Sequence, residues 1–288
     1  MNAVNLYILC EGTKLDNLVD YQKVLTNSYE KKQLKNAEID TLKRFINELL
    51  NWGIDIEDLD GFFYGFSIPQ ISKEFDLLKI FENDVVVNIE LKSHDIDLDK
   101  IEYQLRKNRY YLSHLKKKTY SFTYINSGEK GKIYSYDGDK LFKSNIEEIA
   151  QLISLKGMFI KENIESLFKA KDYLISPINT PQLFVEENYY LTGQQEEIKN
   201  KIINGINNDE HKIWGIQGSA GTGKTLLLYD IAKTLGQIMK VCVIHSGILS
   251  QGHIELNSIL REVDIIPAKE CNENSIRQYD CILIDESQ

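Results

Sequence analysis

Gly218-Ser219-Ala220-Gly221-Thr222-Gly223-Lys224-Thr225 is the stretch that decides the fold of the region around it. It fits the pattern G-x-x-x-x-G-K-[ST] at every fixed position. Small residues in such a loop let backbone N–H groups turn inward around phosphate oxygens, the lysine reaches the outer phosphates, and the threonine hydroxyl can ligate Mg²⁺. Residues 211–217 predict a short apolar strand before the loop, and Lys224–Leu235 predict a helix after it. This context favours a phosphate site over a chance glycine-rich turn.

The composition is that of a globular protein with about two domains. The chain has 288 residues, of which 42% are hydrophobic and 27% charged. The amino-terminal sequence lacks the pattern of a signal peptide, and no apolar run is long enough to span a membrane, so we expect a cytoplasmic protein without membrane contact. The four cysteines and five histidines show no metal-ligand spacing.

Charge is unevenly distributed along the chain. The net charge of −9 argues against indiscriminate coating of nucleic acid. Residues 100–118, however, carry one acid, Glu102, against seven basic residues: Lys100, Arg106, Lys107, Arg109, Lys116, Lys117 and Lys118. Tyrosines 103, 110 and 111 lie among them. The run is either a solvated helix face or a surface that contacts phosphates.

An amphipathic helix is predicted over Asn36–Trp52, because its apolar residues recur at helical spacing. Glu38 falls near the edge of the apolar face, whereas Glu48 points away from it. Glu38 is therefore the carboxylate of interest, although a first-turn glutamate is also favoured by the helix dipole alone.

Three strands are predicted next, over Phe62–Ile68, residues 73–81 and residues 84–93. Alternation in the third strand places Asn88, Glu90 and Lys92 on one face. Charged side chains that are buried without partners are costly, so Glu90 and Lys92 must pair with each other or serve a metal site. Asp76 is likewise a charged residue within an apolar strand.

Asp76, thirteen intervening residues and then Glu90-Leu91-Lys92 resemble the D…(E/D)-x-K signature of the PD-(D/E)xK, restriction-endonuclease-like superfamily, close to nuclease-related domains that precede helicases. The resemblance implies that Asp76 and Glu90 hold Mg²⁺ or Mn²⁺ and that Lys92 orients the attacking water. Two carboxylates on adjacent strands also suit a hard cation on chemical grounds. No proline precedes Asp76, unlike the full signature. An ordinary sheet with a Glu90–Lys92 surface ion pair is the alternative.

Two further residues match weaker elements of these nucleases. The resemblance implies that Glu38 is an additional acid near the metal. It also implies that Gln104, in a helix after Lys92, looks toward the site. Strands at Thr119–Ile125 and Lys132–Tyr136, either a hairpin or two neighbouring strands, and a helix from Ile146 to Leu155 are expected to complete this domain.

The second half of the chain resembles superfamily 1 helicases. Leu191-Thr192-Gly193-Gln194-Gln195, which leads into a helix over 196–204, is similar to their adenine-recognition motif and implies that role for Gln195. Strands are predicted at residues 240–245 and 281–284, and the latter leads into Asp285-Glu286-Ser287-Gln288, which resembles the D-E-x-Q box. The resemblance implies Mg²⁺ binding by Asp285 together with Thr225, water activation by Glu286, and phosphate sensing by Gln288. The implied nucleotide is ATP.

Together these features predict an α/β chain with three parts. Residues 1–155 form a nuclease-like domain, 156–189 an ordered connector, and 190–288 the first part of a RecA-like motor. The resemblance implies further strands, an arginine finger and a second lobe after Gln288, so we expect an incomplete motor with weakened nucleotide binding.

The function implied is a metal-dependent nuclease coupled to an ATP-dependent helicase or translocase. Its substrate is expected to be DNA rather than RNA, in DNA repair or defence against foreign DNA. The alternative is an ATP-regulated nucleic-acid-binding or signalling protein with an inactive nuclease-like domain. The sequence leaves open a homo-oligomer or a partner subunit.

Overall fold

The computed structural model describes residues 1–12, 36–69, 71, 73–169, 173, 175–207 and 213–285. The chain divides into two compact units, Met1–Asp172 and Tyr173–Gln288. Both units are α/β, the first with a six-stranded mixed sheet and the second with a three-stranded parallel sheet. The stretch expected to be a connector is shared between them: Phe168 packs on Phe66 in the first unit, and Phe184 belongs to the core of the second. None of the described helices is both long and apolar enough to cross a membrane.

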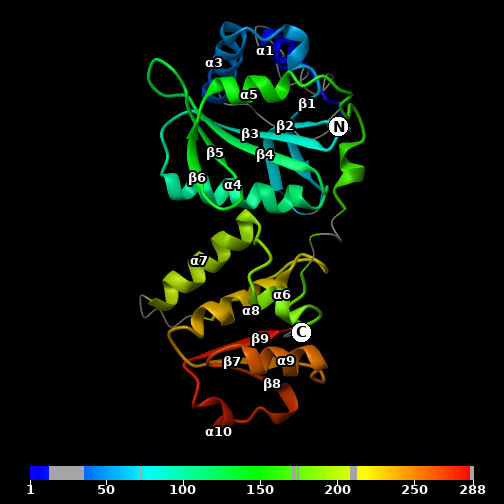
Figure 1. The fold of residues 1–288 in the computed structure, drawn as a ribbon. Coiled ribbons are helices and arrows are strands. Elements are labelled where there is room, and N and C mark those ends of the chain that lie inside the picture. Colours follow the sequence, from blue (N-terminus) through cyan, green and yellow to red (C-terminus); the bar gives the residue numbers. More distant parts are fainter. Residues whose placement is uncertain are drawn as a thin grey trace. The chain divides into compact units, whose positions relative to one another are not determined.

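The sheet of the first unit follows the order of its strands along the chain (Figure 1). Neighbouring strands are antiparallel except β3 and β4, which are parallel and are connected through the helix α4 (Leu98–Ser113). The strands are β1 (Phe62–Ile68), β2 (Lys73–Ile80), β3 (Val85–Lys92), β4 (Lys118–Ile125), β5 (Lys132–Tyr136) and β6 (Leu141–Ser144). The first five were expected from the sequence, whereas β6 was not.

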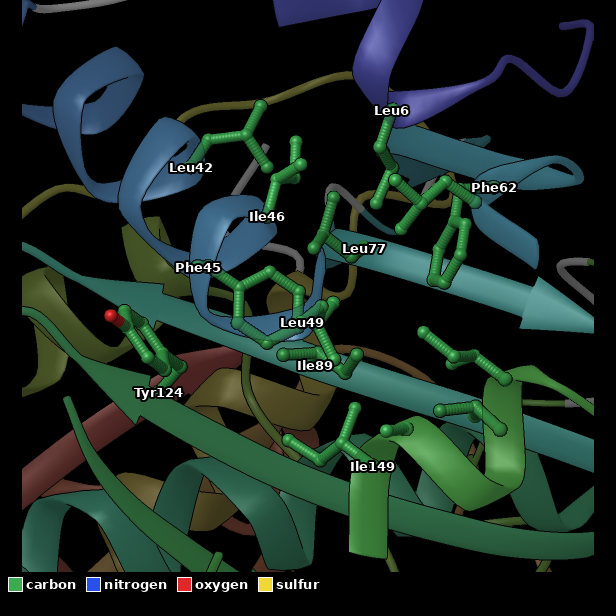
Figure 2. Close-up of a cluster of buried hydrophobic side chains, with 14 of the residues drawn as sticks. Leu6, Leu42, Phe45, Ile46, Leu49, Phe62, Leu77, Ile89, Tyr124 and Ile149 are labelled. Atoms are coloured by element: carbon green, nitrogen blue, oxygen red, sulfur yellow. The ribbon is translucent and has the colours of Figure 1, made fainter. Parts of the chain in front are cut away.

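Helices cover both faces of this sheet (Figure 1). One face carries α1 (Leu6–Gly12), α3 (Asn36–Trp52) and α5 (Ile146–Ile153), and α4 covers the other. Figure 2 shows how Phe45 and Leu49 of α3 lie over Ile89 of β3 in the main core. Each such fully buried side chain stabilises the fold by about 1.5–3 kcal/mol. The helix predicted over Asn36–Trp52 is confirmed with the same bounds.

Glu48, which helical spacing places away from the apolar face, joins α3 to the sheet. Its Oε1 accepts hydrogen bonds from the Tyr124 hydroxyl (2.8 Å) and the Gly131 N–H (2.9 Å). Arg44 pairs with it and also donates to Asn126 Oδ1 at 2.6 Å. Glu48 therefore stabilises the fold at the β4–β5 loop.

A lysine is buried in the opposite end of this core. The Lys79 side chain is 2% exposed and donates to the backbone oxygens of Asp58 (2.8 Å) and Ile153 (3.1 Å). Its ammonium group also lies 5.1–5.3 Å from the ring centroids of Phe62, Phe81 and Phe159. Burial lowers the pKa of Lys79 to about 8, although the charges of Asp58 and Asp60 act in the opposite direction. The lysine thus links β2 to the end of α5.

We expect Lys79 to make the stability of the first unit depend on pH. Between about pH 8 and 10.5, the unfolded chain holds a proton that the folded protein has released, so stability rises with pH across that window. Relative to Lys79→Met, the wild-type protein should gain up to about 3 kcal/mol of unfolding free energy over this range. Urea unfolding at a series of pH values, followed by Trp52 fluorescence in a Trp214→Phe background, measures this free energy.

The exposed Lys140 provides the control for this measurement. A Lys140→Met variant should show the same pH dependence as the wild-type protein. If the stability difference between the wild-type protein and Lys79→Met stayed constant from pH 7.5 to 10.5, Lys79 would have an ordinary pKa in the folded state.

The second unit is built on a parallel sheet in the order β8-β7-β9. The strands are β7 (Val241–His245), β8 (Val263–Pro267) and β9 (Cys281–Asp285), and the helices are α6 (Pro181–Val185), α7 (Gly193–Asn207), α8 (Lys224–Leu235), α9 (Gln251–Ile259) and α10 (Glu273–Ile276). The strands β7 and β9 and the helices α7 and α8 were expected; β8 was not. A buried carboxylate, Asp230 of α8, pairs with Lys199 of α7 at 2.6 Å. This ion pair holds the two helices together.

The strand predicted at 211–217 is wrong over its described part. Residues 213–217 have no strand structure, and the Ile213 side chain is fully exposed. An apolar run forms a strand only when a neighbour takes up its backbone N–H and C=O groups. Within the described residues, β9 pairs with β7 alone, and its Ile282 and Ile284 side chains are exposed.

Candidate functional site

The end of the β2–β3 ladder places Asp76 beside the strand that carries Glu90. Pairing of the two strands runs from Ile80↔Val86 to Leu77↔Ile89. Beyond that point, the Asp76 carboxylate accepts the backbone N–H of Leu91 at 2.9 Å. This side-chain hydrogen bond takes the place of a backbone hydrogen bond between β2 and β3. It holds the Asp76 carboxylate where the pairing of the two strands ends.

Glu90 is buried beneath α4, with 2% of its surface exposed. One carboxylate oxygen accepts a hydrogen bond from Gln104 Nε2 and the other from Asn108 Nδ2, the latter at 2.6 Å. Burial, followed by the negative charge of Asp76, raises the pKa of Glu90 to about 7, although nearby Lys73 and Lys92 act in the opposite direction. Gln104 was expected to look toward this site, and the structure places it there.

The sheet face toward α4 carries a buried polar layer around Glu90. Alternation predicted that Asn88 and Glu90 share a face, and both hydrogen-bond to Asn108 of α4. In the neighbouring strand β4, Ser121 and Thr123 stand opposite these two residues. Among the described residues, three buried polar atoms of this layer have no hydrogen-bond partner: Asn108 Oδ1, Ser121 Oγ and Thr123 Oγ1. Polar groups without partners in a protein interior are uncommon.

Sequence reasoning missed Asn108, although its position four residues after Gln104 was a usable signal. Residues at i and i+4 lie on one face of a helix, so a helix that presents Gln104 to the sheet presents Asn108 as well. The pair holds both oxygens of one carboxylate and thereby sets the orientation of Glu90.

Two lysines supply positive charge to the carboxylates. Lys92 is half-buried on β3, at the alternate position that faces the same side as Glu90. Lys73, at the start of β2, was not singled out from the sequence. Burial lowers the pKa of Lys73, whereas the charges of Glu90 and Asp76 act to raise it. Lys73 is therefore a second cation close to the acidic pair.

Glu38 lies in the first turn of α3, at the same end of the sheet as Asp76. Burial raises the pKa of the Tyr64 hydroxyl, and the negative charges of Asp76, Glu38 and Glu74 raise it further. Glu38 and Asp76 are thus both close enough to Tyr64 to act on one hydroxyl. Within the described residues, however, no three His, Cys, Asp or Glu side chains converge into a metal-binding group.

The donor set of this site nevertheless fits a hard divalent cation. Asp76 and Glu90 both offer carboxylate oxygens, which Mg²⁺ and Mn²⁺ prefer. The raised pKa of Glu90 reflects negative charge that is not fully compensated in a desolvated place. A cation would provide this compensation.

The glycine-rich loop of the second unit, residues 218–225, is called the phosphate loop after the role predicted for it. Gly221 and Gly223 both have φ +77°, a conformation that favours glycine, and α8 begins directly afterwards at Lys224. A Cβ at Gly223 would lie 2.6 Å from Gln195 Nε2, the end of a flexible side chain, so the positive φ and not a lack of space favours glycine here. Gly218, Ser219, Ala220, Gly221 and Thr222 are exposed.

Lys224 folds back over the loop. Its ammonium group donates to the backbone oxygens of Gly218 and Ser219, both at 2.9 Å. The same loop is braced by Thr222, whose hydroxyl donates to Ser219 O at 2.9 Å. A phosphate that entered the loop would offer Lys224 a charged partner in place of two carbonyls.

Thr225 and Asp285 meet at the carboxyl ends of the parallel strands. The Thr225 hydroxyl lies 3.3 Å from each carboxylate oxygen of Asp285, which is buried at the end of β9. Ser246, just after β7, donates to the backbone oxygen of Asp285 at 2.7 Å. The sequence expected Thr225 and Asp285 to act together, and the fold brings them together across 60 residues. A hydroxyl and a carboxylate in this arrangement fit Mg²⁺ bound to nucleotide phosphates.

Gln195 lies against the phosphate loop. Its Oε1 accepts the Thr192 N–H at 2.9 Å, and its Nε2 donates to Thr222 O at 3.1 Å. The amide therefore bridges the start of α7 and the loop. The adenine contact expected from the sequence stays a prediction. Glu286 and Gln288, expected to activate water and sense phosphate, lie outside the described residues.

Comparison of the chain with protein-family models, curated proteins and solved structures found no match. The site is therefore interpreted from its own geometry.

Proposed function

We propose that this chain is a metal-dependent nuclease coupled to an ATP-dependent, helicase-type motor that acts on DNA. The observation that carries the proposal is the meeting of Asp76 and Glu90 where the β2–β3 ladder ends, with Lys92 on the same strand. The residue types and their order match those of a PD-(D/E)xK site, and the fold supplies the proximity that such a site requires.

The proposed reaction is phosphodiester hydrolysis. Water attacks the phosphorus, a new P–O bond forms, and the bond to the leaving sugar oxygen breaks; the water gives up a proton and the leaving oxygen gains one from solvent. Lys92 orients the water and offsets negative charge on the phosphate. Asp76 and Glu90 would hold Mg²⁺ or Mn²⁺, which when bound polarises the phosphate and lowers the pKa of bound water. Gln104 and Asn108 hold the Glu90 carboxylate in place.

In the second unit we propose ATP binding at the loop 218–225. The backbone N–H groups and Lys224 bind the phosphates, while Thr225 and Asp285 would hold Mg²⁺. We assign this unit to a RecA-like motor domain and the first unit to the restriction-endonuclease-like class. Repair or defence against foreign DNA is the role we propose for such a combination.

The alternative is a nucleic-acid-binding module that does not catalyse cleavage. It is favoured by one observation, that both Glu90 oxygens already accept amide hydrogen bonds inside a buried layer. In that case Glu90 would be a structural residue, and ATP would regulate binding instead of cleavage.

Cleavage by the full chain separates the two functions. With Mg²⁺ or Mn²⁺, the chain should nick supercoiled plasmid DNA, and Lys92→Met should lower the rate about 100-fold or more, because the positioned cation is lost from the reacting phosphate. Gel analysis of nicked plasmid against time measures the rate.

Lys132→Met is the matched control, since Lys132 is an exposed lysine of β5 that pairs with Asp95 at 2.8 Å, with β4 between it and the strand of Lys92. This variant should cleave like the parent. Equal rates for Lys92→Met and the parent would contradict the nuclease assignment, and salt-sensitive binding without any cleavage would support the binding module.

A further inference from the structure

The solvent side of α4 carries an aromatic and basic stripe. Helical spacing places Tyr103, Arg106, Lys107, Tyr110 and His114 along one side of the helix, and these five residues are called the α4 stripe. Tyr103 is 39% exposed, and Arg106 and His114 are also exposed. A single exposed tyrosine is ordinary, but Tyr103 has Arg106 and Lys107 next to its ring.

Cations flank the exposed ring. Arg106 Cζ lies 5.7 Å and Lys107 Nζ 5.9 Å from the centroid of the Tyr103 ring. Tyr110 continues the stripe with edge-on contacts to Tyr111 at 5.1 Å and His114 at 5.8 Å. The stripe therefore offers flat ring surface and positive charge side by side.

The stripe borders the carboxylate site. Tyr103 directly precedes Gln104, and Lys107 directly precedes Asn108, the two residues that hold Glu90. The positive charge of Lys107 also acts on Lys73, which in turn lies close to Asp76 and Glu90. Glu90 lies on the sheet side of α4, so a strand bound along the stripe would pass the edge of the helix at Lys107 to reach the acidic pair.

Two other basic residues of this region hold the fold together. Arg109 donates to Thr119 O at 3.2 Å and packs against Gly138, so it holds α4 to the sheet. Lys117 pairs with Asp84 at 3.3 Å and donates to Glu82 O. The basic run that the sequence marks as either a solvated helix face or a phosphate surface includes Arg109, and the structure places Arg109 against the sheet.

We infer that the α4 stripe binds single-stranded DNA and leads it to the carboxylate site. That the bound DNA leads to the carboxylate site rests on the proposed function, whereas the binding itself does not require cleavage. Exposed rings stack on bases that are accessible, as they are in single strands and not in a closed duplex. Arg106 and Lys107 supply the phosphate contacts, in a chain whose net charge of −9 repels nucleic acid elsewhere.

Binding of a labelled oligo(dT) to the full chain in EDTA, measured by fluorescence anisotropy, tests the inference. The parent should bind oligo(dT) more tightly than a hairpin duplex of equal length. Tyr103→Ala should weaken oligo(dT) binding about 5- to 100-fold, the range that loss of one stacked base implies. Lys107→Gln should lower the slope of log affinity against log salt by about 0.7.

Two variants separate stacking from loss of fold. Tyr103→Trp keeps a flat ring and should bind like the parent. Phe142→Ala removes another aromatic side chain of similar exposure, 38%, from β6 of the same unit and should also bind like the parent.

The inference is overturned if the parent binds no oligo(dT), if the duplex binds as tightly, or if Tyr103→Ala binds like Phe142→Ala. Because no cleavage occurs in EDTA, a failure of the nuclease proposal would leave these results unchanged. Conversely, if Asp76→Asn lost cleavage while Tyr103→Ala bound oligo(dT) like the parent, the nuclease proposal would stand and the stripe assignment would be wrong.

Discussion

Replacing Asp76 with asparagine is expected to lower the rate of metal-dependent DNA cleavage by about 1000-fold. Asparagine can still accept the Leu91 N–H that the Asp76 carboxylate now accepts at 2.9 Å, so the local backbone should keep its conformation. The change removes the negative charge that would hold the cation. Loss of about 4 kcal/mol of transition-state stabilisation corresponds to this factor.

Asp84→Asn is the matched control for this variant. Asp84 lies in the turn between the same two strands, its side chain is exposed, and its positive φ of 66° is one that asparagine tolerates. This variant should cleave and bind Mn²⁺ like the parent, whereas Asp76→Asn should lose both properties. Isothermal titration with Mn²⁺ provides the readout that is independent of cleavage. Normal Mn²⁺ binding by Asp76→Asn would show that Asp76 is not a metal ligand.

The second large effect is expected at the phosphate loop. Lys224→Ala should weaken ATP binding about 100-fold, because a charge-assisted contact with a phosphate is worth about 3 kcal/mol. Among the described residues the same ammonium group donates to the carbonyls of Gly218 and Ser219, and we expect its removal to cost little stability. Titration of the full chain with a fluorescent ATP analogue in Mg²⁺ measures the affinity.

Lys240→Ala serves as the control, since Lys240 is an exposed lysine of the same unit. It should bind the analogue like the parent. If Lys224→Ala and Lys240→Ala bound equally well, the loop would not be the nucleotide site. A cleavage rate that responds to ATP in the parent but not in Lys224→Ala would further tie the motor to the nuclease.

Much of the candidate site could be predicted from the sequence because its signals are local. Strand-like runs after a turn-rich stretch predicted β1, β2 and β3. Alternation within the third placed Asn88 and Glu90 on one face, as their shared contact with Asn108 confirms. The glycines at 221 and 223 take positive φ angles, a conformation that local sterics allow glycine more readily than other residues. The helix after the loop begins at Lys224, as the sequence indicated.

The tertiary structure alone decided the partners of these residues. Packing of α4 and β2 brings Asn108 and Lys73 close to the acidic pair. Arg109 of the basic run is held against the sheet, because its guanidinium donates to Thr119 O. The strand predicted at 211–217 did not form over its described residues, because strand structure needs a neighbour whose position no local pattern specifies.

Residue type and spacing thus determined which chemistry this chain carries: two carboxylates and a lysine on adjacent strands, and a glycine-rich loop followed by a lysine. Burial, charge and hydrogen bonding between distant segments determined how that chemistry is held, including the raised pKa of Glu90 and the pairing of Thr225 with Asp285. The reason is physical. Backbone geometry follows from near neighbours, whereas desolvation and contact depend on segments that meet only once the chain has folded.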